Sequence, residues 1–130
     1  MAHKKYITTA EKLGAIASNN RRYHKTKKGK LMLTYNNMTR RVTGYVKPHL
    51  YKGLDICSRD VFYDWSLNNE SFNYLYIDWV NSGFKRALSP SIDRIDTNKG
   101  YVSENIQWIT LSENSKKGAI SRHKKTTSNE

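Results

Sequence analysis

The most regular alternation of apolar and polar positions lies in the last third of the chain. In residues 91–96 the character of the side chains alternates, with Ile92 and Ile95 bracketing Asp93, and residues 96–100 are turn formers. Residues 106–110 are β-branched and aromatic, which suits a half-buried pleated surface. The pattern therefore predicts two short antiparallel strands joined by a loop.

A helix is expected directly after the second strand. Thr110 and Glu113 have the spacing of a capping box, in which each side chain covers a backbone amide at the start of a helix. This puts Asn114 in the first turn. Because two short strands must bury their apolar face against another element, we expect Asp93, near the end of the first strand, to approach Asn114. A carboxylate and an amide oxygen are the hard ligands that suit Mg²⁺.

Earlier segments show helical spacing. A capping box at residues 8–11 opens a predicted helix through residue 17, with a packing face formed by Leu13, Ile16 and Ala17. Residues 31–42 repeat apolar positions in the same way. Residues 19–30 between them are dense in Lys and Arg. They are either a solvated loop or a phosphate-contacting segment, and mutual repulsion of like charges favours the second.

Gly44 and Pro48 interrupt the helical pattern. We place there a boundary between a basic, DNA-contacting helical arm, residues 1–47, and a core, residues 48–118. A basic, disordered tail is predicted for residues 119–130.

Two further helices are predicted inside the core. Ser58 is a candidate N-cap for a helix that buries Val61, Phe62 and Trp65. The next helix carries an aromatic stripe over residues 72–79 and closes at Ser82 and Gly83. Periodic aromatic residues of this kind are more often core than base-stacking platforms. The fold class is thus α+β, mainly helical with a small antiparallel ββα unit near the C-terminus.

Composition points to a polyanionic partner. The chain has a net charge of +12 and a mean hydropathy of −0.81, so nucleic acid is favoured because every neutralised phosphate releases counterions. No stretch is long or apolar enough for a membrane span, and no apolar run follows the basic start. Cys57 is the only cysteine, which excludes an internal disulfide and a structural zinc site made of thiolates, and fits a reducing cytoplasm.

Four motifs in residues 91–114 occur in a specific order: S-x-D-R-I-D, K-G-Y, N-I-x-W and E-N. With them the segment resembles the ββα-metal motif, or His-Me finger, of HNH endonucleases, in particular the small phage-type, homing-endonuclease-like group. G-L-x-I-C and F-x-x-W further upstream resemble the same group, so the likeness extends back to Gly53. It implies a bacteriophage protein that acts in the host cytoplasm.

The resemblance implies a role for each matching residue. Asp93 would be the acidic metal ligand and Asn114 the second ligand, while Asn105 would tie the loop to the strand and orient the catalytic residue. A purely structural alternative is that Asp93 and Asp96 are solvent-exposed side chains of a turn. Asn105 could likewise serve only to hydrogen-bond the nearby backbone. The implied cofactor is Mg²⁺ or Mn²⁺.

One position departs from the family pattern. Better-understood branches carry a general-base histidine after the metal-binding aspartate, whereas this chain has Arg94, which is protonated at physiological pH. Asp96 or a histidine from elsewhere would then activate the water, with His49 the first to test. Alternatively, Arg94 stabilises phosphate charge while the metal lowers the pKa of the water, or the site is inactive.

The function expected from these observations is a metal-dependent endonuclease or nickase that hydrolyses phosphodiester bonds of double-stranded DNA, as a monomer or weak homodimer. The alternative is a catalytically impaired DNA- or RNA-binding protein that keeps the fold. The residues expected to contact nucleic acid are Arg21, Arg22, Lys27, Lys28, Lys30, Arg40, Arg41, Lys116, Lys117 and Arg122.

Overall fold

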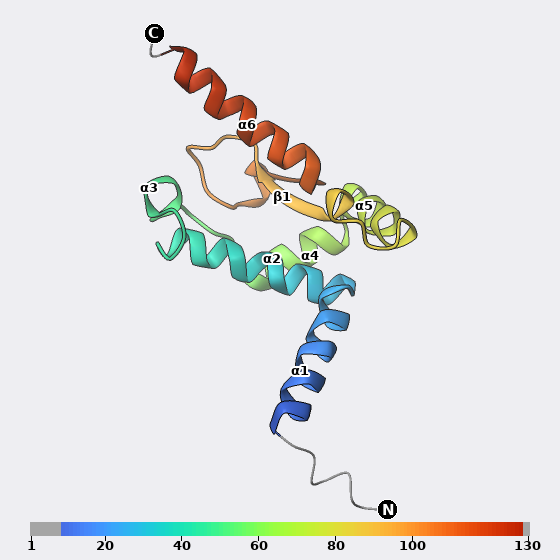
Figure 1. Ribbon diagram of the computed structural model, residues 1–130. Coiled ribbons are helices and arrows are strands. Elements are labelled where there is room, and N and C mark those ends of the chain that lie inside the picture. Colours follow the sequence, from blue (N-terminus) through green and yellow to red (C-terminus); the bar gives the residue numbers. More distant parts are fainter. Residues whose placement is uncertain (1–8, 129–130) are drawn as a thin grey trace, which may run out of the picture.

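A computed structural model describes the backbone of residues 9–128 and the side chains of residues 9–119 (Figure 1). The elements in chain order are α1 (Thr9–His24), α2 (Lys27–Val42), α3 (Pro48–Tyr51), α4 (Arg59–Leu67), α5 (Glu70–Asn81), the 3-10 turn η2 (Arg86–Leu88), β1 (Pro90–Arg94), the 3-10 turn η3 (Ser103–Asn105), β2 (Ile106–Thr110) and α6 (Leu111–Ser128). The predicted class, mainly helical α+β with a two-stranded antiparallel sheet, is confirmed at this level.

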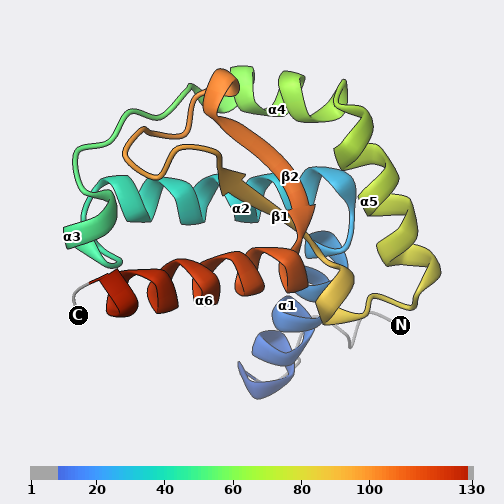
Figure 2. The same ribbon diagram turned by 90° about the horizontal axis from the view of Figure 1, so that it is seen from above.

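The two-stranded hairpin occupies the centre of the molecule. Figures 1 and 2 show it between α2 on one side and α6 on the other, with α4 and α5 closing the remaining side. In the pairing register Ile92 lies opposite Trp108, and Asp93 lies opposite Gln107. Since successive side chains alternate between the faces of a strand, the first pair enters the core and the second faces α6.

Trp108 is the centre of the aromatic core. Its ring centroid lies 4.6 Å from that of Phe72 and 5.9 Å from that of Phe62. Its indole Nε1 donates a hydrogen bond of 3.1 Å to Ser66 Oγ, which satisfies the one polar group of a buried tryptophan. The hairpin is thereby attached to both α4 and α5.

Two predicted helix starts, those of α4 and α6, are confirmed, whereas Thr8 of the capping box expected at residues 8–11 lies outside the described residues. Ser58 Oγ accepts a hydrogen bond from the amide of Val61 at the start of α4, and Thr110 and Glu113 form the expected reciprocal capping contacts. Phe62 is buried as predicted, but Val61 is 50% exposed. That expectation was wrong because Val61 lies one residue, about 100° of helix, before the buried position.

α5 also follows the predicted pattern. Phe72 and Trp79 are buried, and the helix ends at Asn81, where Ser82 is the C-cap. Gly83 follows with a φ of 78°, a conformation that glycine adopts at low cost after a helix.

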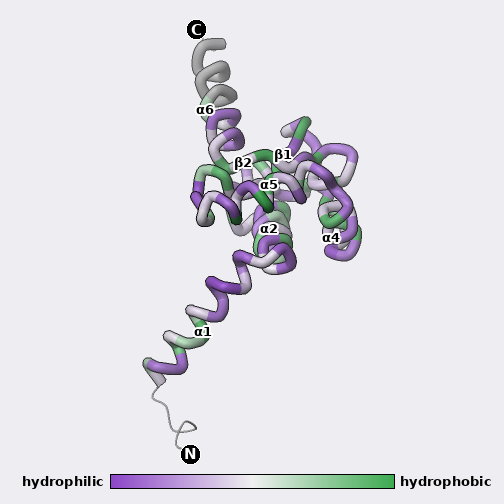
Figure 3. The backbone as a smooth tube through the Cα atoms, turned by 90° about the vertical axis from the view of Figure 1, so that its right-hand side faces the viewer, coloured by the Kyte–Doolittle hydropathy of each residue, from purple (hydrophilic) through white to green (hydrophobic). Residues whose placement is uncertain are grey.

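The predicted packing face of α1 is not buried. Leu13 is 62% and Ile16 56% exposed, and no residue of α1 is buried. Figure 3 shows α1, largely hydrophilic, projecting away from the body of the protein. Two large apolar side chains beside a glycine supply too little area to hold the helix against the core.

The basic stretch between residues 19 and 30 is mainly helical instead of a loop. α1 continues to His24, and α2 begins at Lys27 with Thr26 as its N-cap. α2 also contributes Leu31, Met38 and Val42 to the hydrophobic core. The predicted boundary at residue 47 therefore divides a continuous core, and only α1 has the character of an arm.

The predicted tail requires a correction too. α6 continues to Ser128, so residues 119–128 of the expected disordered tail are helical, and residues 129–130 lie outside the described part. Lys and Arg are good helix formers, which accounts for the continuation of the helix through a basic sequence.

The loop between the strands is attached to the segment before α4. The amide of Tyr101 donates to Asp55 O at 2.8 Å, and the amide of Cys57 donates to Tyr101 O at 2.9 Å. Gly100 makes this approach possible, because a Cβ there would lie 2.0 Å from the carbonyl oxygen of Asp55. The loop is therefore held on both sides, by its strands and by residues 55–57.

Replacing Gly100 with alanine should force these two backbones apart. We expect Gly100→Ala to lower the free energy of unfolding by about 2 kcal/mol or more, as overpacking does. Gly14→Ala is the matched control, since a Cβ on Gly14 meets nothing within 4 Å and should stabilise the helix by up to about 1 kcal/mol. Urea denaturation of both variants measures the difference, and equal stabilities would contradict the close approach.

Candidate functional site

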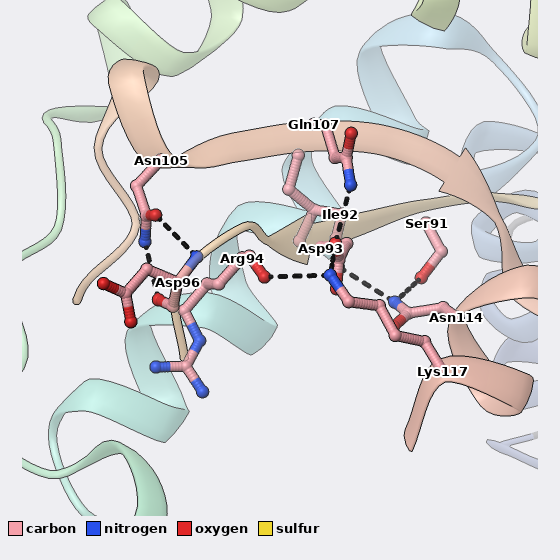
Figure 4. A network of polar contacts seen from close by, with 9 residues as sticks. All are labelled: Ser91, Ile92, Asp93, Arg94, Asp96, Asn105, Gln107, Asn114 and Lys117. Carbon is pink, nitrogen blue, oxygen red and sulfur yellow. Dashed lines mark hydrogen bonds and ion pairs between the residues drawn. The ribbon is translucent and has the colours of Figure 1, made fainter. Parts of the chain in front are cut away.

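Asp93 lies on the hairpin face that is turned toward α6 (Figure 4). Its side chain is only 9% exposed. Oδ2 accepts hydrogen bonds from Gln107 Nε2 at 2.9 Å and from Lys117 Nζ at 2.6 Å. A buried carboxylate is costly unless it is paired and hydrogen-bonded, and here the opposite strand and α6 each supply one donor.

Asn114 is anchored on the same strand. Its Nδ2 donates to Ser91 Oγ at 2.8 Å and to the carbonyl oxygen of Ile92 at 3.0 Å. Because a carbonyl can only accept, the second bond fixes which end of the amide faces β1. Within the described residues no hydrogen bond reaches Asn114 Oδ1, so this oxygen is available to a further ligand.

Local sequence explains why these side chains meet. The capping box starts α6 directly after β2, which brings the first turns of the helix back over β1. Asn114 and Lys117 are three residues apart and therefore share one face of α6. As Figure 4 shows, this spacing lets Asn114 hydrogen-bond the carbonyl oxygen of Ile92 and lets Lys117 pair with the carboxylate of Asp93.

Asn105 organises the loop that follows β1. Its Oδ1 accepts from the amide of Asp96 at 2.8 Å, and its Nδ2 donates to Asp96 O at 3.0 Å and Gly100 O at 2.9 Å. The amide of Ile95 also donates to Asn105 O at 2.7 Å. Asn105 thus ties both ends of the loop to the start of β2, and an effect on catalysis stays a prediction.

The side chain of Arg94 is directed away from Asp93. Its guanidinium donates to the carbonyl oxygens of Thr97 at 2.7 Å and Lys99 at 3.0 Å and lies 4.6 Å from the ring centroid of Tyr51. Arg94 follows Asp93 on β1, so alternation sends the two side chains to opposite faces. The Arg94 side chain therefore supports the loop and makes no hydrogen bond to Asp93 among the described contacts, whereas the Arg94 carbonyl oxygen accepts a bond of 3.4 Å from Lys117 Nζ. Stabilisation of phosphate by Arg94 stays a prediction.

The candidates for a general base are not assembled around Asp93 either. Asp96 Oδ1 accepts from the amide of Asn98 at 2.9 Å and closes a turn. His24 ends α1, and His49 lies in α3. Neither makes a hydrogen bond or ion pair with Asp93 in the described structure, and the side chains of His3 and His123 lie outside the described part.

The basic residues predicted to contact nucleic acid fall into two groups. Lys27, Lys30 and Arg41 are partly buried; Lys27 Nζ donates to Asn73 Oδ1 at 2.8 Å, and Lys30 Nζ to Ser89 Oγ. Burial lowers the pKa of Lys30 below its usual value. The side chain of Arg122 lies outside the described part. The exposed members are Arg21, Arg22, Lys28, Arg40, Lys116 and Lys117.

Two functional contacts were missing from the sequence predictions. Gln107 holds the Asp93 carboxylate from the neighbouring strand, and Ser91 holds Asn114. The register of the strands would have identified Gln107, but a long loop does not fix a register as a tight turn does. The contact of Ser91 with Asn114 also depends on how α6 returns over β1. The contact of Lys117 with Asp93 depends on the same register.

The donor set can be tested against a divalent ion. Asp93 and Asn114 provide a carboxylate and an amide oxygen, and Mg²⁺ is commonly bound by one or two carboxylates with water and phosphate completing the shell. Within the described residues no group of three or more His, Cys, Asp and Glu side chains gathers. With only two protein oxygen ligands, such a site would need further ligands from water and a substrate, and an ion bound there would compete with the Lys117 ammonium for Asp93.

Comparisons with known proteins add no assignment: no family model, curated protein or solved structure matches the chain. Within residues 9–128 no helix has the length and apolar character needed to cross a membrane. The support for a function consequently comes from the motifs in the sequence and from the geometry around Asp93 and Asn114.

Removing the Asn105 side chain should loosen the loop selectively. In Asn105→Ala the amide of Asp96 loses its acceptor, while the bond from Ile95 to the backbone of residue 105 can persist. We expect hydrogen exchange at the Asp96 amide to accelerate and the free energy of unfolding to fall by about 1–3 kcal/mol. Asn98→Ala is the control, because that side chain is exposed. Unchanged exchange at Asp96 would exclude the clamp.

Proposed function

We propose that this chain is a divalent-metal-dependent DNA endonuclease or nickase of the HNH type. The observation that carries the proposal is the convergence of Asp93 from β1 with Asn114 and Lys117 from α6 on one face of the hairpin. The strand-loop-strand-helix order, the Asn105 clamp and the net charge of +12 support it.

Each residue of the site has a chemical task in this proposal. Asp93 and Asn114 Oδ1 would hold Mg²⁺ or Mn²⁺, which when bound polarises a phosphate oxygen and lowers the pKa of water. Gln107 keeps the Asp93 carboxylate oriented through its hydrogen bond of 2.9 Å. Lys117, released from Asp93, places a positive charge where the phosphodiester gains negative charge.

A specific observation favours a second candidate, a non-catalytic DNA- or RNA-binding protein. The Asp93 carboxylate already has a cation at 2.6 Å, and Arg94 is engaged by the loop. A site that keeps its Asp93 paired with Lys117 and has no histidine in contact would bind phosphate without hydrolysing it. Salt-sensitive binding is common to both candidates, so cleavage decides between them.

The proposed substrate is double-stranded DNA, cut by a monomer or weak homodimer in the cytoplasm, which is the host cytoplasm if a phage encodes the chain. One motif provides one cutting centre. A monomer is therefore expected to nick, and a double-strand break would need two copies.

Alanine at either ligand position should abolish cleavage. Supercoiled plasmid incubated with Mg²⁺ should be relaxed by the wild type but not by Asp93→Ala or Asn114→Ala, because the metal loses a ligand, and EDTA should stop the wild-type reaction. Gln107→Ala removes only the hydrogen bond that orients the Asp93 carboxylate, so it should slow nicking by about 10- to 100-fold. Gel electrophoresis of the plasmid forms measures all of these.

Asp60→Ala is the control variant, because Asp60 is an exposed acidic residue in the first turn of α4 and should leave nicking unchanged. DNA binding by the ligand variants, measured without metal, should persist. If the wild type binds DNA and leaves the plasmid intact with Mg²⁺ and with Mn²⁺, the endonuclease proposal fails and the binding protein is supported.

A further inference from the structure

α2 carries two parallel stripes of different chemistry. The apolar stripe, Leu31, Tyr35, Met38 and Val42, packs into the core or against it. The stripe one residue earlier, Lys30, Thr34, Asn37 and Arg41, is polar and basic at the same helical spacing. Since neighbouring residues are about 100° apart on a helix, burying the first stripe places the second at the edge of the core.

That second stripe lines a groove. The opposite wall is formed by residues 89–92 at the start of β1 and by Leu111 of α6. The groove lies between α2 and the start of β1, and Figure 1 shows α2 and α6 on opposite sides of the hairpin. Its volume is about 190 Å³.

The two cations at the groove are held in place by aromatic side chains. Lys30 Nζ lies 5.1 Å from the ring centroid of Trp79 and donates to Ser89 Oγ. Arg41 Nη1 donates to the hydroxyl of Tyr101 at 3.2 Å, and its guanidinium carbon lies 5.4 Å from the ring centroid of Tyr51. Because these contacts already order the Lys30 and Arg41 side chains, binding an anion would cost less side-chain conformational entropy.

The size and lining of the groove select a phosphate. Pockets for drug-sized ligands typically occupy about 300–1,000 Å³, so a groove of about 190 Å³ is small for a flipped nucleobase with its sugar. Its ammonium, guanidinium, hydroxyl and amide groups are the donors that contact phosphate oxygens in protein–DNA complexes. The described residues that line it include no carboxylate, and Leu33, Pro90, Ile92 and Leu111 form its apolar part.

The groove and the candidate metal site share two residues. Ser91 and Ile92 line the groove, and the same two residues accept the hydrogen bonds that anchor Asn114. A strand lying in the groove would consequently reach the Asn114 side chain with a neighbouring phosphodiester. This connection links binding on α2 with the ligands on β1 and α6.

We propose that the groove between α2 and β1 binds a backbone phosphate of the substrate strand, next to the phosphodiester held at Asp93 and Asn114. The inference rests on the proposed nucleic-acid partner but does not require cleavage. It gives α2 the task of setting the path of the strand past the site.

Asn37 allows a test that spares the core. It lines the groove and is exposed, so a charge can be introduced there without changing the core. Because Arg41 lies one helical turn further on, the new charge also acts directly on that groove cation. Asn37→Glu should weaken binding to a labelled duplex, measured by fluorescence anisotropy in EDTA, by about tenfold and reduce the salt slope by about one. Asn37→Lys should tighten binding and steepen the slope.

Ser71→Glu and Ser71→Lys are the matched controls. Ser71 is exposed and lines a different hollow, together with Glu70, Tyr74 and Glu113. The same charge changes there should alter affinity by less than about threefold, as expected for a charge outside the phosphate contacts. Circular dichroism and thermal melting verify that all four variants fold.

Each outcome has a separate meaning. A wild type that binds no nucleic acid overturns the proposed function and this inference with it. A wild type that binds while Asn37 and Ser71 variants respond equally overturns the groove alone. Equal shifts of the Asn37 side-chain amide in NMR spectra with inorganic phosphate and with the duplex at equal phosphate concentration would identify a free-anion site and also overturn it.

Discussion

The burial of Trp108 is the interaction on which the rest of the structure depends. Two strands alone are marginally stable in water, and burying one large aromatic side chain contributes about 1.5–3 kcal/mol. Trp108 contacts Phe62 of α4 and Phe72 of α5 and donates a hydrogen bond to Ser66, so it attaches the hairpin to two helices at once.

The same burial decides which side chains face α6. With Trp108 and Ile92 directed into the core, the alternation of β-strands leaves Asp93 and Gln107 on the other face. A slip of one residue would turn the carboxylate toward the aromatic core and the tryptophan toward α6, so the same hydrophobic contact that stabilises the fold also orients the candidate site.

The electrostatics of the site follow from that constraint. Asp93 is nearly buried, and its charge is balanced by Lys117 at 2.6 Å and by the amide of Gln107. A pair with one nearly buried and one exposed partner contributes little net stability, because desolvation of Asp93 offsets part of the attraction and solvent screens Lys117. Its value in the proposed function is that a cation already occupies the side of Asp93 where a divalent ion would bind. If a divalent ion replaced the Lys117 ammonium at Asp93, that ammonium would be free to bind phosphate. The charge of Asp93 would be balanced before and after the exchange.

The sequence was sufficient for elements whose signals are local. The capping box at Thr110, the N-cap at Ser58 and the C-terminal end of α5 depend on residues within one helical turn, and these three were predicted correctly. The orientation of α1 was not, because two exposed apolar residues on a helix look the same in sequence whether or not another surface covers them. Gln107 and Lys117 contact Asp93 only through the strand register and the return of α6. These are tertiary features that a long loop leaves undetermined.

Arg94 shows how a motif residue can be understood once its surroundings are known. Loop carbonyl groups need donors when they are withdrawn from water, and the Arg94 guanidinium supplies two of these bonds while lying over the rings of Tyr51 and Tyr101. A histidine side chain is shorter and has two ring nitrogens, so it could not reproduce the fork of donors that contacts both Thr97 and Lys99. The arginine is therefore explained by the loop that it supports, independently of whether hydrolysis occurs. That loop fixes the end of β1, and through it the position of Asp93.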